Sequence, residues 1–97
     1  MISHLVLFTL KPGVVADDLR VVRAIEGMST LPERISLIRG WEHGPNLTPD
    51  AQAADYALRA LFDDEADLHA YFEHPAHLPV VDAWDAVATL SFADFRL

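Results

Sequence analysis

Residues 2–9, with the sequence ISHLVLFT, decide the fold of this chain. The stretch is rich in β-branched and aromatic residues and ends at the turn residues 11–13, Lys-Pro-Gly, which is typical of a strand closed by a turn. Alternate side chains of a strand point to opposite faces, and both faces here carry large apolar residues: Ile2, Val6 and Phe8 beside His4 on one, Leu5 and Leu7 on the other. We therefore predict a strand that is covered on both sides.

A helix is expected to follow this strand, from Val15 to about Ser29. Its apolar residues recur every three or four positions, which predicts the following buried side: Val15, Leu19, Val22, Ile25 and Met28. Asp17 and Asp18 are expected in its first turn, where the positive end of the helix dipole favours carboxylates. Pro32 is expected to separate this helix from a second strand over roughly 35–43.

The sequence pattern of the second half of the chain predicts two further strands and two helices. Residues 55–62 alternate like a strand, and the acidic residues within 63–67 mark the start of a helix that must end before Pro75. Another helix is expected to begin with Pro79 in its first turn. A last strand is expected over 89–97.

The order of these elements is β-α-β-β-α-β, which predicts an α+β fold. Short connections and right-handed crossovers turn this order into a ferredoxin-like subunit, with a mainly antiparallel sheet and helices on one face. The other face of the sheet stays bare, although the strand over 2–9 is apolar on both sides. We therefore expect a second copy of the chain to cover it, as a homodimer. Residues 1–97 are expected to form one domain.

Composition excludes several classes of function. The chain has 7 basic and 15 acidic residues, a net charge of −8, which disfavours nucleic acids and anionic membranes as partners. It has no cysteine, which excludes disulfides, thiolate nucleophiles and cysteine-based metal sites. Residues 1–10 lack the features of a signal peptide, and no apolar stretch is long enough to span a membrane, so a cytoplasmic protein is expected.

The densest cluster of reactive side chains is YFEHPAH, residues 71–77. His74 and His77 are three residues apart, but Pro75 breaks the helical geometry of paired zinc ligands, so no metal site is expected. Two interpretations stay open. The histidines could cap neighbouring helix ends, or His77 could be a general base, because the helix that follows it disfavours the imidazolium form and keeps its ring neutral.

The remaining histidines carry weaker signals. His4 is either an ordinary hydrogen-bonded core residue or a polar group inside a cavity, since a buried imidazole needs a partner. His43 is expected at an exposed strand end, and His69 in the middle of a solvated helix face. No nucleotide-binding or nucleophile motif occurs, so no cofactor is expected.

Four segments together resemble the Dabb family, the stress-responsive dimeric α/β-barrel domains. They are HLVLF at 4–8, GPN at 44–46, the strand at 56–62 and, above all, the pattern Y-x-x-H-P-x-H from Tyr71 to His77. The resemblance covers essentially the whole chain. It implies a ferredoxin-like subunit whose sheet packs on that of its twin to form a dimeric α/β barrel.

The resemblance also implies candidate catalytic residues. Plant polyketide cyclases of the family use a histidine and a tyrosine of this pattern in an aldol cyclisation. On that pattern His77 is the general base, Tyr71 orients the substrate or stabilises an oxyanion, and His4 is a second polar group in the pocket. The third strand runs Tyr56-Ala57-Leu58, without the histidine of the plant cyclases, so a different substrate pocket is expected.

Three hypotheses about function follow. The first is a cofactor-independent cyclase or lyase that acts on a small carbonyl or polyketide-like molecule. The alternative is a non-catalytic, stress-associated homodimer that binds a small hydrophobic ligand or a protein. A third hypothesis comes from the monooxygenases of the wider barrel superfamily, although no residue pattern here demands haem.

Overall fold

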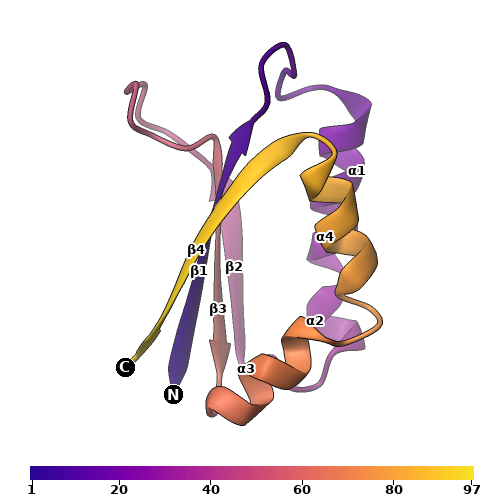
Figure 1. The fold of residues 1–97 in the computed structure, drawn as a ribbon, viewed down its shortest axis with the longest axis vertical. Helices are drawn as coiled ribbons and strands as arrows, with labels where there is room; N and C mark the ends of the chain where they lie inside the picture. Colours follow the sequence, from indigo (N-terminus) through magenta and orange to yellow (C-terminus); the bar gives the residue numbers. More distant parts are fainter.

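The chain forms one antiparallel sheet with helices packed on one of its faces (Figure 1). The computed structural model describes residues 1–97. Its elements are β1 (Ile2–Leu10), α1 (Leu19–Ser29), α2 (Leu31–Arg34), β2 (Gly40–Pro45), β3 (Tyr56–Phe62), α3 (Glu65–Phe72), α4 (Leu78–Asp85) and β4 (Ala88–Arg96). The four strands lie in the order β2-β3-β1-β4, and every neighbouring pair is antiparallel. The predicted ferredoxin-like α+β fold is confirmed.

Strand β1 lies inside the sheet, between β3 and β4. The side chains that point toward the helices are buried, with Phe8 at only 2% exposure. On the opposite face Leu5 is 36% and Leu7 48% exposed. The helices of this chain therefore cover one apolar face of the strand and leave the other open.

Helix α1 begins later than the sequence predicted. Residues 15–18 form a turn, and Asp18 is the N-cap of a helix that starts at Leu19. The Asp18 carboxylate accepts a hydrogen bond from the backbone N–H of Arg20, at 2.9 Å. This carboxylate therefore satisfies a free N–H group of the first turn. Asp17 and Asp18 thus both precede the first turn, in which the sequence predicted them.

The buried side of α1 also differs from the expected one. Val21, Ala24 and Met28 face the core, whereas Leu19 remains 57% exposed. Val15 lies in the turn before the helix and is 59% exposed. Met28 is buried as expected, and the other two buried residues have the same helical spacing as the expected residues that remain exposed.

Strand β2 is shorter than expected and starts at Gly40. Residues 35–39 form turns and bends instead, although Ile35 is fully buried. Pro32 lies in the first turn of the short helix α2, where its missing N–H has no cost. The segment between α1 and β2 is thus partly helical, and the prediction of a strand over 35–43 was wrong for its first half.

The second half of the chain follows the sequence prediction closely. The Asp64 side chain caps α3 by accepting from the N–H of Asp67, at 2.8 Å. Helix α3 ends at Phe72, before Pro75, and α4 has Pro79 in its first turn. Strand β4 pairs with β1 along its whole length.

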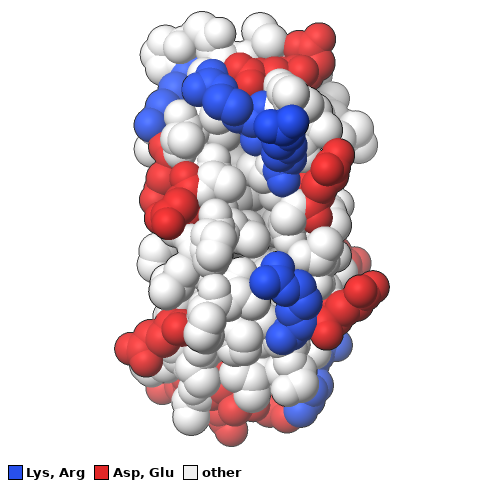
Figure 2. Space-filling view, turned by 90° about the vertical axis from the view of Figure 1, so that its right-hand side faces the viewer, with Lys and Arg blue, Asp and Glu red and all other residues white.

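Figure 2 shows the helix-bearing face, on which acidic and basic side chains lie along both sides of a largely uncharged strip. The two chain ends lie together at one end of the sheet (Figure 1), and the N–H of Leu97 donates to the carbonyl of Met1 at 2.9 Å. None of the helices has the length and apolar character needed to cross a membrane.

Candidate active site

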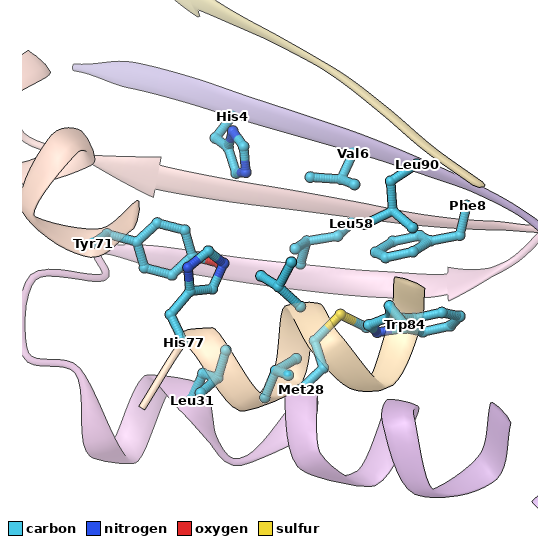
Figure 3. A pocket seen from close by; sticks show the side chains of 12 residues that line it. His4, Val6, Phe8, Met28, Leu31, Leu58, Tyr71, His77, Trp84 and Leu90 are labelled. Atoms are coloured by element: carbon cyan, nitrogen blue, oxygen red, sulfur yellow. The ribbon is translucent and has the colours of Figure 1, made fainter. Parts of the chain in front are cut away.

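A cavity lies between the helix-bearing face of the sheet and helices α3 and α4 (Figure 3). Its inner chamber, of about 40 Å³, extends from His4, Tyr71 and His77 at one end to Phe8 and Trp84 at the other. An outer chamber of about 330 Å³ shares His4 and His77 with it. Phe72, Asp85 and Phe92 line only the outer chamber. The three candidate site residues of the sequence thus meet at one end of one cavity.

His4 is buried and paired with a carboxylate. Its position on β1 lies directly opposite Asp94 of β4, and its Nδ1 lies 2.5 Å from an Asp94 carboxylate oxygen. A carboxylate only accepts, so Nδ1 carries a hydrogen and donates it, and in the neutral ring Nε2 has the free lone pair. One ring nitrogen of His4 points away from β1 into the cavity (Figure 3). Asp94 thus fixes both the orientation of the ring and its tautomer.

His77 is the N-cap residue of α4, but its side chain does not cap that helix. Instead its Nδ1 donates to the backbone carbonyl of Phe72 at 3.2 Å, because a carbonyl can only accept. The second nitrogen, Nε2, therefore has a free lone pair in the neutral ring. Burial lowers the pKa of His77 below the ordinary value of 6.5, and the nearby His4 and His74 lower this pKa further, against the opposing effect of the Phe72 carbonyl. His77 is therefore a neutral proton acceptor at pH 7.

Tyr71 lies next to His77 and is only 1% exposed. The two ring centroids are 4.1 Å apart, and the rings are inclined by 37°. Burial raises the pKa of the Tyr71 phenol above its usual range, so the group keeps its proton and can act as a hydrogen-bond donor. The rings of Phe62 and Trp41 pack against it from the sheet side and hold it in place.

Aromatic rings enclose the histidine end of the cavity. Phe72 and Phe92 lie with their ring centroids 5.4 Å and 5.8 Å from that of His4, and 6.2 Å from each other. Phe92 is 64% exposed because β4 is an edge strand. This wall limits the access of water to His4 on one side of the outer chamber.

The other three histidines do not belong to this cavity. His74 accepts from the N–H of Ala76 at 3.0 Å, within the turn between α3 and α4. His69 is exposed, as predicted. His43, expected at an exposed strand end, is half-buried, and this burial lowers its pKa. Its Nδ1 accepts from the Tyr56 hydroxyl at 2.8 Å. The prediction for His43 was wrong because Tyr56, on the adjacent strand β3, covers its ring.

The arrangement can support proton transfer at a carbonyl compound. Two imidazole nitrogens with free lone pairs, one of them polarised by a carboxylate, meet a protonated phenol in an apolar cavity. Enolisation needs a base near the hydrogen next to a carbonyl group and a hydrogen-bond donor near the carbonyl oxygen.

The family model of the stress-responsive A/B barrel domain, Dabb, matches residues 2–96. The chain belongs to this family. An uncharacterized protein of Streptomyces coelicolor is 40% identical over 96 residues, which are 99% of each chain. The predicted family membership is confirmed.

Solved structures confirm the fold of this Dabb protein. A dimeric ferredoxin-like protein of unknown function from Thermobifida fusca is 28% identical, with a TM-score of 0.85 over 99% of this chain and 90% of that one. The hydroxynitrile lyase of Passiflora edulis is 17% identical, with a TM-score of 0.85 over 99% of this chain and 92% of that one. The second likeness concerns the fold alone.

Asp94 is the residue of this Dabb cavity that the sequence prediction missed. The signal was a single carboxylate on the side of the last strand that also carries Leu90 and Phe92, an otherwise apolar set. Its meaning depends on the pairing of β4 with β1, which places Asp94 opposite His4. That register was not part of the sequence prediction.

Proposed function

We propose that this Dabb protein is a cofactor-independent enzyme that removes a proton next to the carbonyl group of a small, largely apolar substrate. His77 is the general base and Tyr71 the donor to the carbonyl oxygen. The observation that carries the proposal is the tautomer of His77. Its Nδ1 is held by the Phe72 carbonyl, which leaves Nε2 as a neutral base beside a protonated phenol.

The proposed step breaks one C–H bond adjacent to the carbonyl group. The proton goes to Nε2 of His77, the electron pair forms the C=C bond of an enolate, and the Tyr71 hydroxyl stabilises the oxygen that becomes negative. His4, whose ring is held in place by the Asp94 carboxylate, can hydrogen-bond to a substrate hydroxyl. The enolate carbon can then attack a second carbonyl group, as in a cyclase, or be protonated again.

Two findings support an enzyme. The cavity is lined mainly by apolar side chains, and these strengthen interactions between its few polar groups. A hydroxynitrile lyase has the same fold, so an enzyme that acts on a small molecule can be built on it.

The test is hydrogen exchange at a simple ketone. Nonan-2-one in D₂O should exchange its α-hydrogens faster with the protein than in buffer, as measured by mass spectrometry. His77→Asn should reduce the protein-catalysed rate by about 10²- to 10⁴-fold. His69→Asn is the matched control, because His69 is exposed and lies outside the cavity. If the ketone binds but no exchange above buffer occurs, the non-catalytic, ligand-binding alternative holds.

We also infer that the protein is a homodimer whose subunits pack through the open face of the sheet. That face has exposed apolar side chains, among them Leu5 and Leu7 on the inner strand β1 and Phe95 on the edge strand β4. Contiguous apolar surface of this kind is typical of an interface between subunits. The relative from Thermobifida fusca is dimeric, which supports the inference.

A further inference from the structure

The outer chamber is the part of the cavity that has room for a ligand. Its volume is about 330 Å³, whereas the inner chamber, at about 40 Å³, holds little more than one water molecule. His4 and His77 line both chambers. A ligand whose carbonyl group reaches these histidines must therefore place the rest of its chain in the outer chamber.

The outer chamber follows one side of helix α4 and is elongated. His77, Val81 and Asp85 line it, and because they recur every four residues they lie on the same side of the helix. Eight residues of an α-helix span about 12 Å, so Asp85 lies well away from His77. The opposite wall includes the apolar Leu90 and Phe92 of β4. The histidines and Asp85 thus lie at opposite ends of an apolar chamber.

Apart from the two histidines, Asp85 is the only ionisable residue in this wall. Its side chain is exposed at the end of α4, and its backbone carbonyl, rather than its carboxylate, accepts from the Nζ of Lys11 at 2.6 Å. The N–H of Lys11 donates to the carbonyl of Val87 at 2.9 Å, which holds this lysine beside the end of the helix. The Asp85 carboxylate is therefore free to accept a hydrogen bond from a ligand, and the nearby ammonium group offsets part of its charge.

We propose that the outer chamber binds an uncharged hydroxyketone, with its carbonyl group at His77 and its hydroxyl group donating to the Asp85 carboxylate. An uncharged donor fits better than a cation, because Lys11 already supplies a positive charge at this end. An anionic end is excluded, since neither chamber is lined by a lysine or an arginine and a carboxylate would face Asp85 without gaining a cation.

The length of the ligand follows from the helix. Of the roughly 12 Å between His77 and Asp85, the contact at each end takes about 3 Å. About 6 Å remain between the hydroxyl oxygen and the carbon next to the carbonyl group. About five single bonds of an extended chain cover that distance. 7-Hydroxyheptan-2-one has this spacing.

The inference rests on the proposed function for the end that carries the carbonyl group, and its test can be separated from that function. The probes are 7-hydroxyheptan-2-one, heptan-2-one, 6-oxoheptanoate and 7-(dimethylamino)heptan-2-one, which share one ketone and differ at the distal end. Binding is followed by NMR titration of the ¹⁵N-labelled protein, through the backbone N–H resonances of Asp85 and Ala86.

The hydroxyketone should move these resonances and bind about three- to tenfold more tightly than heptan-2-one, since only the hydroxyketone has a donor for the carboxylate. The oxo acid and the protonated amine should both bind more weakly than the hydroxyketone. In Asp85→Ala the advantage of the hydroxyketone over heptan-2-one should disappear. In Asp85→Asn the oxo acid should bind more tightly than in the parent protein, because the like charge is gone.

Asp82→Ala is the matched control, because Asp82 is exposed on the same helix but does not line the chamber. It should keep the preference for the hydroxyketone. Asp85→Ala should fold, since a carboxylate at the C-terminal end of a helix does not stabilise that helix.

Four results would overturn the inference: no binding of the hydroxyketone, equal affinity for the hydroxyketone and heptan-2-one, an advantage that persists in Asp85→Ala, or tighter binding of either charged probe. None of these readouts depends on catalysis. A preference that is lost in Asp85→Ala, without hydrogen exchange of nonan-2-one, would refute the proposed enzyme alone. Hydrogen exchange without this preference would refute the present inference alone.

Discussion

Replacement of Asp94 by alanine tests the pairing that fixes His4. Asp94 is the hydrogen-bond partner of the His4 Nδ1, at 2.5 Å, and the His4 side chain is 5% exposed. The variant leaves a buried N–H without a partner, which costs about 1–3 kcal/mol. The Asp94 side chain is 25% exposed, so water can reach the vacated position and the lower part of that range is expected.

A loss of about 1–2 kcal/mol lowers the melting temperature of a domain of this size by about 4–16 °C. The assay is thermal unfolding by circular dichroism at one protein concentration, since dimers melt in a concentration-dependent way. Asp82→Ala, which removes one exposed carboxylate from α4, controls for the change in net charge and should melt within about 2 °C of the parent protein. If the melting temperature of Asp94→Ala equals that of Asp82→Ala, His4 and Asp94 are not paired in solution.

The remaining predictions concern pH, assembly and a helix cap. The pKa of His77 is below 6.5 in the folded protein, so the His77 ring binds a proton more readily in the unfolded chain. The free energy of unfolding, measured in urea, should therefore fall as the pH drops below about 6.5. A free energy of unfolding that is the same at pH 7.5 and pH 5.5 contradicts this. Sedimentation should give about twice the 10.8 kDa subunit mass, and Leu7→Glu should give the monomer; a monomeric parent protein would refute the dimer. Asp64→Ala should destabilise the protein by about 1 kcal/mol and Asp64→Asn by much less, because asparagine also caps helices; equal losses in urea unfolding would show that the cap on Asp67 does not form.

The order of the elements along the chain and the helix starts of the second half were predictable because their signals are local. Turn residues, acidic helix starts and the prolines at 75 and 79 act on their immediate neighbours in the chain. The apolar pattern of residues 2–9 likewise predicted a strand, and β1 lies inside the sheet, but the helices of this chain cover only one of its two apolar faces.

The errors occurred where two local patterns competed. In α1, a set through Leu19 and Val22 has helical spacing, as has the set of Val21, Ala24 and Met28 that is actually buried. The choice between them depends on contacts with α4, which are long-range and do not appear in the periodicity. The same limit applies to His43, whose burial comes from Tyr56 on the adjacent strand.

Tyr71 and His77 were proposed from the Y-x-x-H-P-x-H pattern and His4 from its place on the first strand, but the hydrogen bonds that orient the two histidines were not predicted. The tautomer of His77 depends on the Phe72 carbonyl, and that of His4 on Asp94. Both partners are brought into contact by the turn after α3 and by the register of β4. Hydrogen bonds between residues so far apart in the sequence, or to a backbone carbonyl within a turn, can be identified only in the three-dimensional structure.

The most direct test of the central claim is an NMR titration of the His77 ring. His77 must be neutral near pH 7, with its hydrogen on Nδ1 and its lone pair on Nε2, for the cavity to work as proposed. Side-chain ¹⁵N spectra, assigned with the His77→Asn variant, should show this tautomer and a pKa below the ordinary 6.5. A His77 ring that titrates at or above 6.5, or that carries its hydrogen on Nε2, would contradict the account.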